Sequence, residues 1–289
     1  MGESESGQQE KSEIIILLPG ILFPDNHSCA CPDEEQSDGT RGRTLVQHTF
    51  IQPIKFRSSF LLNTHYTYFI ILAASLAGPL ALSFDKKVAF YKKWKYLFPA
   101  MLLPAIFYVV WDSWFTSLGV WSFNPEYITG IRLLNLPVEE VLFFFIVPYC
   151  CVFIYECIIA YFPSIQNNRG ADLFLKTLAA VLFIAALVVY DRYYPAYTFV
   201  LFALFTLLFY LFRKYFSSFR TSYFLIAYGV TQIPFLVVNG FLTAIPVVLY
   251  NDAENLGFRI YTIPLEDTFY GMLLVFMNLA IYEKLRTKY

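Results

Sequence analysis

Long apolar runs alternate with short polar or charged segments over most of this 289-residue chain. From about residue 64 onward, seven runs come close to the roughly 20 residues that a helix needs to cross a bilayer. These runs cover residues 64–84, 96–118, 137–161, 171–190, 195–212, 222–249 and 264–283. Spanning segments must be helical, because backbone groups in hydrocarbon need internal hydrogen bonds. The pattern therefore predicts an all-α integral membrane protein with seven transmembrane helices.

The sixth run is longer than one span and contains Pro234 and Pro246. Proline removes a backbone hydrogen bond and bends or ends a helix. We therefore expect this helix either to be kinked or to end before Pro246.

The N-terminal segment, 1–62, differs from the rest of the chain. It is rich in Gly, Ser, Glu and Asp, and its one apolar stretch, Ile14–Phe23, is interrupted by Pro19 and too short to span a bilayer. The stretch also lacks the basic lead and the small-residue cleavage site of a standard signal peptide. We expect residues 1–62 to be a disordered N-terminal extension.

Composition and charge agree with a membrane protein and orient it. The chain is 57% hydrophobic and 15% charged, with a mean hydropathy of +0.52. Basic residues gather in the loops after the first, third and fifth runs and after the seventh, and such loops face the cytoplasm. These residues are Lys86, Lys87, Lys92, Lys93, Lys95, Arg169, Arg213, Lys214, Arg220, Lys284, Arg286 and Lys288. The C-terminus is therefore predicted inside and the N-terminus outside.

The second half of the chain repeats the first. Placing residues 111–156 on 238–283 without a gap gives ten identities in 46 positions, with polar residues such as Asn124/Asn251 and Arg132/Arg259 in register. Shared apolar composition does not readily supply polar matches, so an internal duplication is the simplest interpretation. It predicts two parallel three-helix repeats, residues 63–162 and 191–289, joined by a linker helix within 163–190.

Each repeat contains one motif of a proline followed by two acids, at the start of an apolar run. The motifs are Leu136-Pro137-Val138-Glu139-Glu140 and Ile263-Pro264-Leu265-Glu266-Asp267. Proline with an acid close behind is a common helix opening, in which the carboxylate complements the helix dipole. Ionisable groups at a membrane boundary are, however, costly and usually functional.

Two copies of the motif in register favour a chemical role. If Glu139 and Glu266 approach each other across the repeat axis, one of them can stay protonated, as in other carboxyl pairs that share a proton. Such a pair is suited to acid–base catalysis. Adjacent residues on a helix point about 100° apart, so Glu140 and Asp267 need not face the same cavity.

Further polar groups lie close to the motifs in the sequence. Asp112 lies inside the second run between Trp111 and Trp114, and an acid within the membrane needs a partner. Its repeat partner is Asn239, for which an interhelical hydrogen bond is an equally good explanation.

Two arginines, Arg132 and Arg259, occupy equivalent places shortly before the proline of each motif. They either pair with the carboxylates and hold them ionised or serve as interfacial anchors. Aromatic residues make up 20% of the chain, and some of their rings can stabilise a carbocation through their π faces.

Several stretches of the chain resemble the membrane-integral lycopene cyclases, a bacterial, archaeal and fungal family made of two small homologous subunits or one fused chain. In the first half they are Ser83-Phe84-Asp85-Lys86-Lys87, Tyr91-Lys92-Lys93-Trp94-Lys95, Trp111-Asp112-Ser113-Trp114, Gly119-Val120-Trp121-Ser122-Phe123-Asn124-Pro125 and the first motif. In the second half they are Asn239-Gly240, Arg259 and Pro264-Leu265-Glu266-Asp267. The resemblance covers about residues 64–289.

The resemblance implies a redox-neutral cyclisation of the linear ψ ends of lycopene. It implies that Glu139 and Glu266 are proton donor and base between them, with Glu140 and Asp267 assisting and Asp112, Asn239, Arg132, Arg259, Trp111 and Trp114 in support. The β ring, giving β-carotene through γ-carotene, is the expected product. Loss of the C6 proton gives β and loss of the C4 proton gives ε, and the sequence does not distinguish them.

The resemblance implies no cofactor, and the chain has no Gly-x-Gly-x-x-Gly after a strand. No metal site is expected either, because the five cysteines lack zinc-site spacing. The partners expected are lycopene and a monocyclic carotenoid within a bacterial-type inner membrane, together with membrane lipids, and no nucleic acid. A homo-oligomer and an association with other carotenoid enzymes both stay open.

Other functions fit the sequence less well. A hydratase of the same fold, acting on carotenoid end groups, is the nearest alternative. A small transporter with three-plus-one-plus-three helices should have a polar site at mid-membrane, whereas the acids here lie toward one face. A retinal receptor needs a lysine in the seventh run, and residues 268–282 contain none. A purely structural protein does not explain the duplicated carboxylates.

Overall fold

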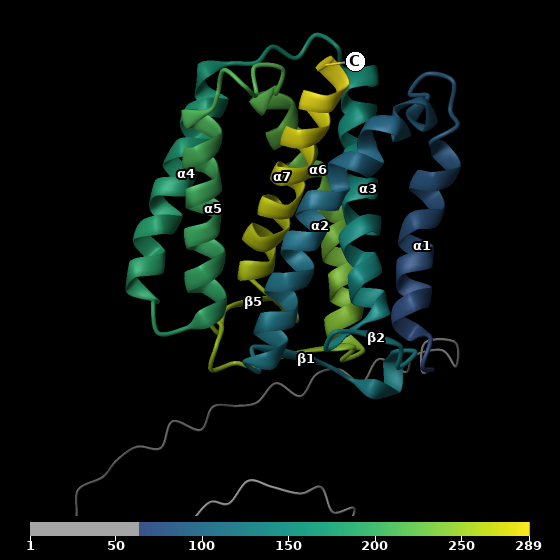
Figure 1. Cartoon of the computed structure of the whole chain (residues 1–289), viewed down its shortest axis with the longest axis vertical. Helices are drawn as coiled ribbons and strands as arrows, with labels where there is room; N and C mark the ends of the chain where they lie inside the picture. Colours follow the sequence, from purple (N-terminus) through teal and green to yellow (C-terminus); the bar gives the residue numbers. More distant parts are fainter. Residues whose placement is uncertain (1–63, 289) are drawn as a thin grey trace, which may run out of the picture. The chain divides into compact units, whose positions relative to one another are not determined.

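The computed structural model describes residues 64–288, which form a bundle of α-helices with three short two-stranded sheets at one end (Figure 1). The helices are α1 (Thr67–Leu82), α2 (Trp94–Ser117), α3 (Val138–Tyr161), α4 (Arg169–Val188), α5 (Tyr193–Leu211), α6 (Thr221–Ala244) and α7 (Glu266–Lys288). Two 3-10 helices, η2 (Phe90–Lys93) and η3 (Pro125–Tyr127), lie in the connections. The predicted extension at residues 1–62 lies outside the described residues.

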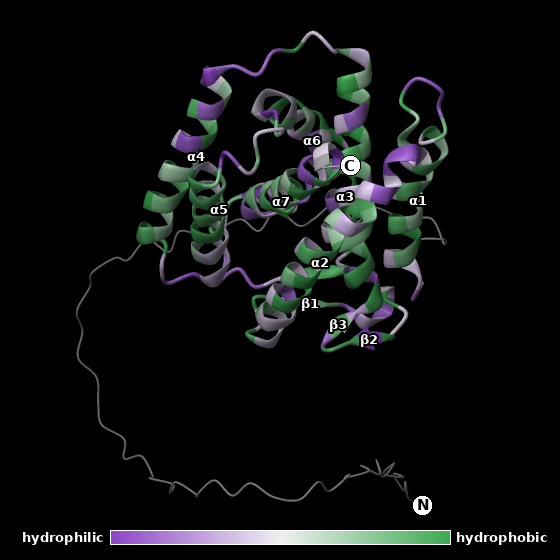
Figure 2. Cartoon of the chain, turned by 45° about the horizontal axis from the view of Figure 1, so that its top comes forward, coloured by the Kyte–Doolittle hydropathy of each residue, from purple (hydrophilic) through white to green (hydrophobic). Residues whose placement is uncertain are grey.

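Five helical segments are long and apolar enough to cross a membrane: α2 with η2, α3, α4, α5 and α6. Helix α1 is apolar but has only 16 residues. Helix α7 has 23 residues but contains the buried polar side chains of Asn278 and Glu283. In Figure 2, hydrophobic residues predominate along the helices and hydrophilic residues gather at helix ends and in loops. The described part of the chain is thus mostly helical and has the character of a membrane protein.

For the sixth predicted run, the expectation that the helix ends before Pro246 is confirmed, so the helix is shorter than the run at 222–249. Helix α6 ends at Ala244, before Pro246, and the remaining apolar residues form strand β4 (Val248–Tyr250). Proline cannot supply the backbone N–H that a continuing helix needs, so the chain leaves the helical conformation there.

Short strands occupy the connections at one end of the bundle, although the sequence predicts only helices. Strand β1 (Trp121–Phe123) pairs antiparallel with β4. Two hairpins, β2 (Arg132–Leu133) with β3 (Leu136–Pro137) and β5 (Arg259–Ile260) with β6 (Ile263–Pro264), precede α3 and α7. These pairings satisfy backbone groups next to apolar helix ends, where unpaired groups are costly. The hairpins fix how α3 and α7 begin.

Equivalent local contacts recur in the two halves of the chain. In the first hairpin Arg132 pairs with Pro137, and in the second the equivalent Arg259 pairs with the equivalent Pro264. Positive φ angles also coincide, at Gly130 (81°) and Gly257 (72°) and at Leu134 (58°) and Tyr261 (60°). Packing between the halves is also equivalent. Helix α2 packs on α7, and α6, the equivalent of α2, packs on α3, the equivalent of α7. The two hairpin regions therefore share one backbone conformation.

A buried polar cluster joins α3 to α7 at the end remote from the strands. Tyr155 donates to Glu283 Oε1 and Tyr282 donates to Glu156 Oε1, both at 2.8 Å. The two glutamates, Glu156 and Glu283, are 0% and 1% exposed. Arg286 lies 2.6 Å from Glu156 and 3.2 Å from Glu283, and thus bridges both carboxylates.

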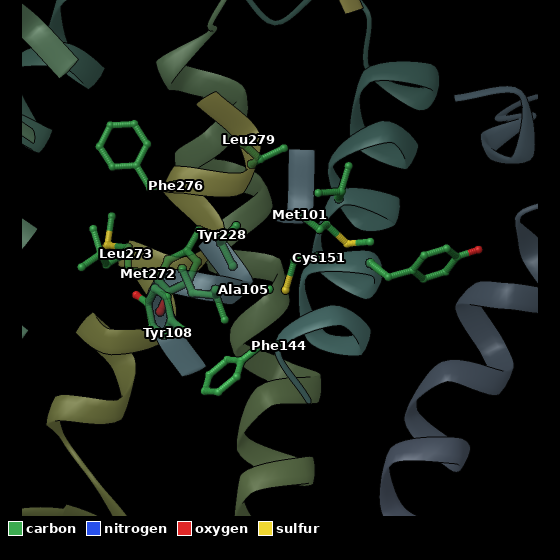
Figure 3. Packing of buried hydrophobic residues seen from close by; sticks show 14 of the residues in the cluster. Met101, Ala105, Tyr108, Phe144, Cys151, Tyr228, Met272, Leu273, Phe276 and Leu279 are labelled. Carbon is green, nitrogen blue, oxygen red and sulfur yellow. The ribbon is translucent and has the colours of Figure 1, made fainter. Parts of the chain in front are cut away.

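The core between the two halves combines aromatic and aliphatic side chains (Figure 3). The ring of Tyr108 in α2 lies 5.5 Å from that of Phe144 in α3 and 4.8 Å from that of Tyr270 in α7, between centroids. Tyr108 also donates to the Tyr270 carbonyl at 2.9 Å. Outward side chains such as Ile184 and Leu207 are more than half exposed, as contact with lipid tails requires.

Candidate active site

A cavity of about 240 Å³ lies chiefly among α1, α3, α6 and α7. Glu140, Asp267, Asp112 and Asn239 line it near the strands, and apolar side chains line most of the remainder, as far as Ile154. The stretch of α3 from Glu140 to Ile154 corresponds to a helix length of about 20 Å. Among the described residues that line the cavity there is no Lys, Arg or His. The site is therefore a long apolar space with an acidic end.

Two acids of the first half lie at this acidic end. Glu140, in the first turn of α3, is 8% exposed and accepts a hydrogen bond of 2.6 Å from Tyr68 of α1. Asp112 of α2 is 2% exposed, and its Oδ2 has no hydrogen-bond partner within residues 64–288. The carboxyl groups of Asp112 and Glu140 interact electrostatically. Among the described hydrogen bonds, the Tyr68 phenol thus binds Glu140 alone, and Asp112 accepts none.

Asp267, in the first turn of α7, has a richer set of donors. Tyr194 of α5 donates to Oδ1 at 2.5 Å, and Tyr250 and Asn239 donate to Oδ2 at 2.9 and 3.2 Å. Removal from water raises the pKa of the Tyr250 phenol well above its ordinary value, and the charge of Asp267 raises it further. The Tyr250 phenol therefore keeps its proton and remains a donor to Asp267.

The first acid of each motif makes a different contact. Glu139 Oε1 accepts the backbone N–H of Thr129 at 2.7 Å, and Glu266 Oε1 accepts that of Leu256 at 2.5 Å. Both glutamates are fully buried, and neither lines the cavity. These two equivalent contacts hold the loop before each hairpin against the start of its helix.

The structure thus brings together a different pair of motif acids from the expected one. The expectation assigned the leading roles to Glu139 and Glu266, whereas Glu140 and Asp267 are the motif acids that line the cavity. The angle of about 100° between neighbouring helix residues accounts for the separation. Asp112 lines the cavity as well, as does Asn239.

The two arginines bind their own hairpins. Arg132 donates to the Asn135 carbonyl at 3.0 Å, and Arg259 donates to the Thr262 carbonyl at 2.7 Å. Arg259 also lies 2.5 Å from Asp252, and this hydrogen bond lowers the pKa of the Asp252 carboxyl. Among the described contacts, the arginines therefore support the turns and do not pair with the motif carboxylates.

The two tryptophans flank the site without lining it. Trp111 is 4% exposed, and its ring centroid lies 4.9 Å from that of Tyr270, a residue of the cavity wall. Trp114 is 41% exposed and packs on Tyr197, with centroids 5.0 Å apart.

Sequence reasoning missed the tyrosines that bind the cavity acids. Tyr68 and Tyr194 stand at the starts of α1 and α5, the first helix of each half, and each donates to the cavity acid of its own half. The ungapped repeat comparison places Tyr68 on Pro195, so only a one-residue shift in the first helix would have aligned it with Tyr194. Tyr250 carries no such signal, because it comes close to Asp267 only through the strand pairing of β1 with β4.

Comparison with known proteins identifies relatives of one kind. A lycopene beta-cyclase of Halobacterium salinarum is 32% identical over 93 residues, which are 30% of this chain and 37% of that protein. A bifunctional lycopene cyclase/phytoene synthase of Aspergillus niger is 30% identical over 79 residues, 25% of this chain and 13% of that protein. Another, from Neurospora crassa, is 44% identical over 45 residues, 16% of this chain and 8% of that protein.

The chain thus spans less than half the length of each of these relatives. No solved structure matches this chain. The sequence profile described as Lycopene cyclase matches two stretches, residues 65–158 and 191–285, which together make up more than half of the chain. Both stretches include an acid motif and most of the helix that follows it. The chain belongs to the lycopene cyclase family.

Proposed function

We propose that this protein is a lycopene β-cyclase, which closes rings on the linear ψ ends of lycopene without redox change. The observation that carries the proposal is the cavity itself. It is long and apolar, and its acidic end brings one motif acid from each half, Glu140 and Asp267, to the same space. A rigid polyene that stays in the bilayer needs such a space to bring its end group to an acid and a base.

The reaction needs one proton donor and one proton acceptor. A proton adds to C2 of the ψ end and leaves a tertiary cation at C1. The electrons of the C5=C6 bond then form the C1–C6 bond and move the cation to C5. Loss of the C6 proton restores a C5=C6 double bond in a β ring. One proton enters and one leaves, so the product is an isomer of the substrate.

The side chains around the cavity suit each of these steps. Glu140 from the first half and Asp267 from the second half are the acid–base pair. The rings of Trp121, Tyr270 and Phe143 line the same cavity and present π electrons to a cationic intermediate. A cavity wall of mostly apolar side chains protects the cation from water.

We also infer how the bundle lies in the membrane. Seven spans form two parallel repeats, α1–α3 and α5–α7, with α4 as the linker and the C-terminus in the cytoplasm. Support comes from the hairpin contacts that recur in the two halves, from the two matches to one family profile, and from the basic loops. Those loops connect the helix ends remote from the strands (Figure 1).

The test is coexpression of the chain in a lycopene-accumulating bacterium without a cyclase, with the pigments separated by chromatography. We expect β-carotene from the unmodified chain. Glu140→Gln should lower ring formation by about 100-fold or more, the usual effect of losing a general acid or base. Glu139→Gln is the matched control, because its Oε1 still accepts the Thr129 N–H, and we expect it to keep ring formation per folded molecule.

Two outcomes would contradict the proposal. Unchanged lycopene in cells that contain the folded chain would exclude cyclisation. A hydroxylated end group in place of a ring would show that the cation is captured by water, and would make the chain a hydratase.

A further inference from the structure

The two halves of the acidic end differ in chemistry at one pair of equivalent positions. Asp112 in α2 corresponds to Asn239 in α6, whereas Glu140 and its equivalent Asp267 are both acids. Asn239 Nδ2 donates to Asp267 Oδ2 at 3.2 Å. An amide thus neighbours one motif acid, and a second carboxyl group neighbours the other.

The carboxyl group of Asp112 beside Glu140 favours a bound proton in the first half. Asp112 is 2% exposed, lines the cavity and has an Oδ2 without a partner within residues 64–288. It interacts electrostatically with Glu140, and no basic side chain among the described residues lines the cavity. Two ionised carboxylates in a space of low dielectric constant repel each other strongly, so such a pair keeps one proton between them.

The other half surrounds its carboxylate with more hydrogen-bond donors. Asp267 accepts hydrogen bonds from Tyr194, Tyr250 and Asn239. Hydrogen bonds to the charged form stabilise that form, and an amide donates without needing to be protonated first. Asp267 therefore has three donors to its charged form, whereas Glu140 has one and Asp112 has none among the described hydrogen bonds.

We propose that the duplicated site is divided into an acid half and a base half. Asp112 and Glu140 share the proton that adds to C2 of the substrate, and Asp267 takes the ring proton. Asn239, like Tyr194 and Tyr250, is a positioning residue that holds Asp267 ionised. The inference rests on the proposed function and assigns the two roles within it.

The proton and electron balance closes over one turnover. The proton leaves the Asp112–Glu140 pair for C2, and the electrons of the C5=C6 bond form the C1–C6 bond. The electrons of the C6–H bond then form the new double bond, and the proton passes to Asp267. When the product leaves, Asp267 returns the proton to the pair. The titratable groups that face the pair are Tyr68 from α1, Tyr250 from β4, Asp267 and Tyr270 from α7, and Glu139 from α3 itself.

The experiment uses deuterium to separate the two halves. Membranes that contain the full chain are incubated with lycopene in D₂O, and both the product and the recovered lycopene are analysed by mass spectrometry. Asp267→Asn keeps the acid half, so protonation at C2 continues and reverses. We expect recovered lycopene that contains deuterium, with ring formation lowered by about 100-fold or more. Asp112→Asn removes the shared proton, and we expect neither rings nor deuterium in the lycopene.

The matched variant for Asp112→Asn is the opposite substitution, from Asn to Asp, at the equivalent position of the second half. Asn239→Asp places a second carboxyl group beside Asp267 and turns the base half into a second acid pair. We expect it to behave like Asp267→Asn, with deuterium in lycopene and few rings. A residue that only supports the fold would not produce this combination, since a misfolded chain exchanges no deuterium.

Each remaining outcome overturns the assignment. Deuterium in lycopene from Asp112→Asn but not from Asp267→Asn would reverse the roles. Absence of deuterium with both Asp267→Asn and Asn239→Asp, in variants that reach the membrane in normal amounts, would show that the halves do not act separately. Failure of the proposed function looks different, because the unmodified chain would then form no rings: it would return unlabelled lycopene or, as a hydratase, a deuterated carotenoid with a hydroxylated end group.

Discussion

The Tyr194 phenol donates to Asp267 at 2.5 Å from a fully buried position. Tyr194→Phe removes this donor and keeps the ring. A hydrogen bond to a charged group contributes about 1.5–3 kcal/mol, so we expect ring formation to fall roughly 10- to 100-fold. Asp267 then holds a proton more readily, and the acidic limb of the pH–rate profile should move to higher pH. The measurement is the initial rate in membranes as a function of pH.

The neighbouring Tyr193→Phe is the control for this prediction. Tyr193 is 41% exposed and stacks on Tyr197, with centroids 6.0 Å apart. Its substitution should leave both the rate and the profile in place. An unchanged profile with Tyr194→Phe would mean that the phenol does not set the charge of Asp267.

The acid motifs were predictable from the sequence, but the choice between neighbouring acids was not. Repetition identified Glu139, Glu140, Glu266 and Asp267 as candidates, because polar residues in register are improbable in an apolar chain. Which acid faces the cavity depends on the rotation of α3 and α7 about their own axes. That rotation follows from packing against other helices and from very short hairpins, and neither has a clear pattern in the sequence.

At the scale of single elements, the two hairpins contain a backbone conformation that costs free energy. Leu134 and Tyr261 begin the hairpin turns with φ of 58° and 60°, where glycine is preferred. Both side chains are exposed, at 68% and 73%, so their removal loses little packing. We expect Leu134→Gly to stabilise the fold by about 0.5–1 kcal/mol, the left-handed penalty less the added freedom of the unfolded chain.

Thermal unfolding in detergent measures this effect. The adjacent Leu133→Gly is the control, because Leu133 lies in strand β2 and glycine weakens a strand. It should lower the unfolding midpoint. If both variants lower the midpoint, the turn at Leu134 is not strained.

We expect a substitution in the polar cluster between α3 and α7 to lower the stability of the fold and to leave ring formation unchanged. Glu156→Ala leaves Lys93 without its buried partner and leaves Arg286 with Glu283 alone. Breaking a buried pair costs about 3–5 kcal/mol, and because these cations are about one quarter exposed we expect roughly 2 kcal/mol. Glu156 lies more than four turns along α3 from Glu140, a distance of about 24 Å.

Ring formation per folded molecule should therefore be retained in Glu156→Ala. The measurement combines a denaturation curve with pigment analysis normalised to the folded protein. Normal stability together with lost ring formation would place the cluster in the reaction instead of in the fold.

The helices themselves were largely predictable, because apolar runs of this length have few other solutions in a membrane. The strands were not. Each is too short for an alternating pattern to be recognised in the sequence. Their consequences are nevertheless large, since β4 brings Tyr250 to Asp267.

At the scale of the whole molecule, the two halves share equivalent contacts but contribute different side chains to the cavity wall. Gly271 lines it, and a Cβ there would lie 3.8 Å from both Phe235 and Tyr228. The equivalent residue in the first half is Phe144, which is fully buried with its ring 5.5 Å from that of Tyr108 (Figure 3). Tyr108 is in turn equivalent to Phe235. An aromatic ring thus fills in one half the place that glycine leaves open in the other.

This asymmetry predicts that one side chain can close the site. Gly271→Phe copies the residue of the first half into the second and fills the cavity beside Phe235, while Glu140 and Asp267 stay in place. A ring in this space competes with the bound end group, and because each 1.4 kcal/mol of lost binding is a factor of about ten, we expect ring formation to fall roughly tenfold or more. Gly271→Ala introduces contacts at an ordinary 3.8 Å and should have a smaller effect, with Gly271→Leu between the two.

The measurement is pigment analysis of the Ala, Leu and Phe variants beside their thermal unfolding midpoints. A loss of rings that grows with side-chain volume, in chains that stay folded, places the end group of the polyene next to α7. Full activity of a folded Gly271→Phe would place the end group elsewhere and leave the acids of this cavity without a substrate. Because the variants keep every acid of the cavity, a fall in rate that follows side-chain volume reports on the space beside α7, and this series tests the binding site separately from the chemistry.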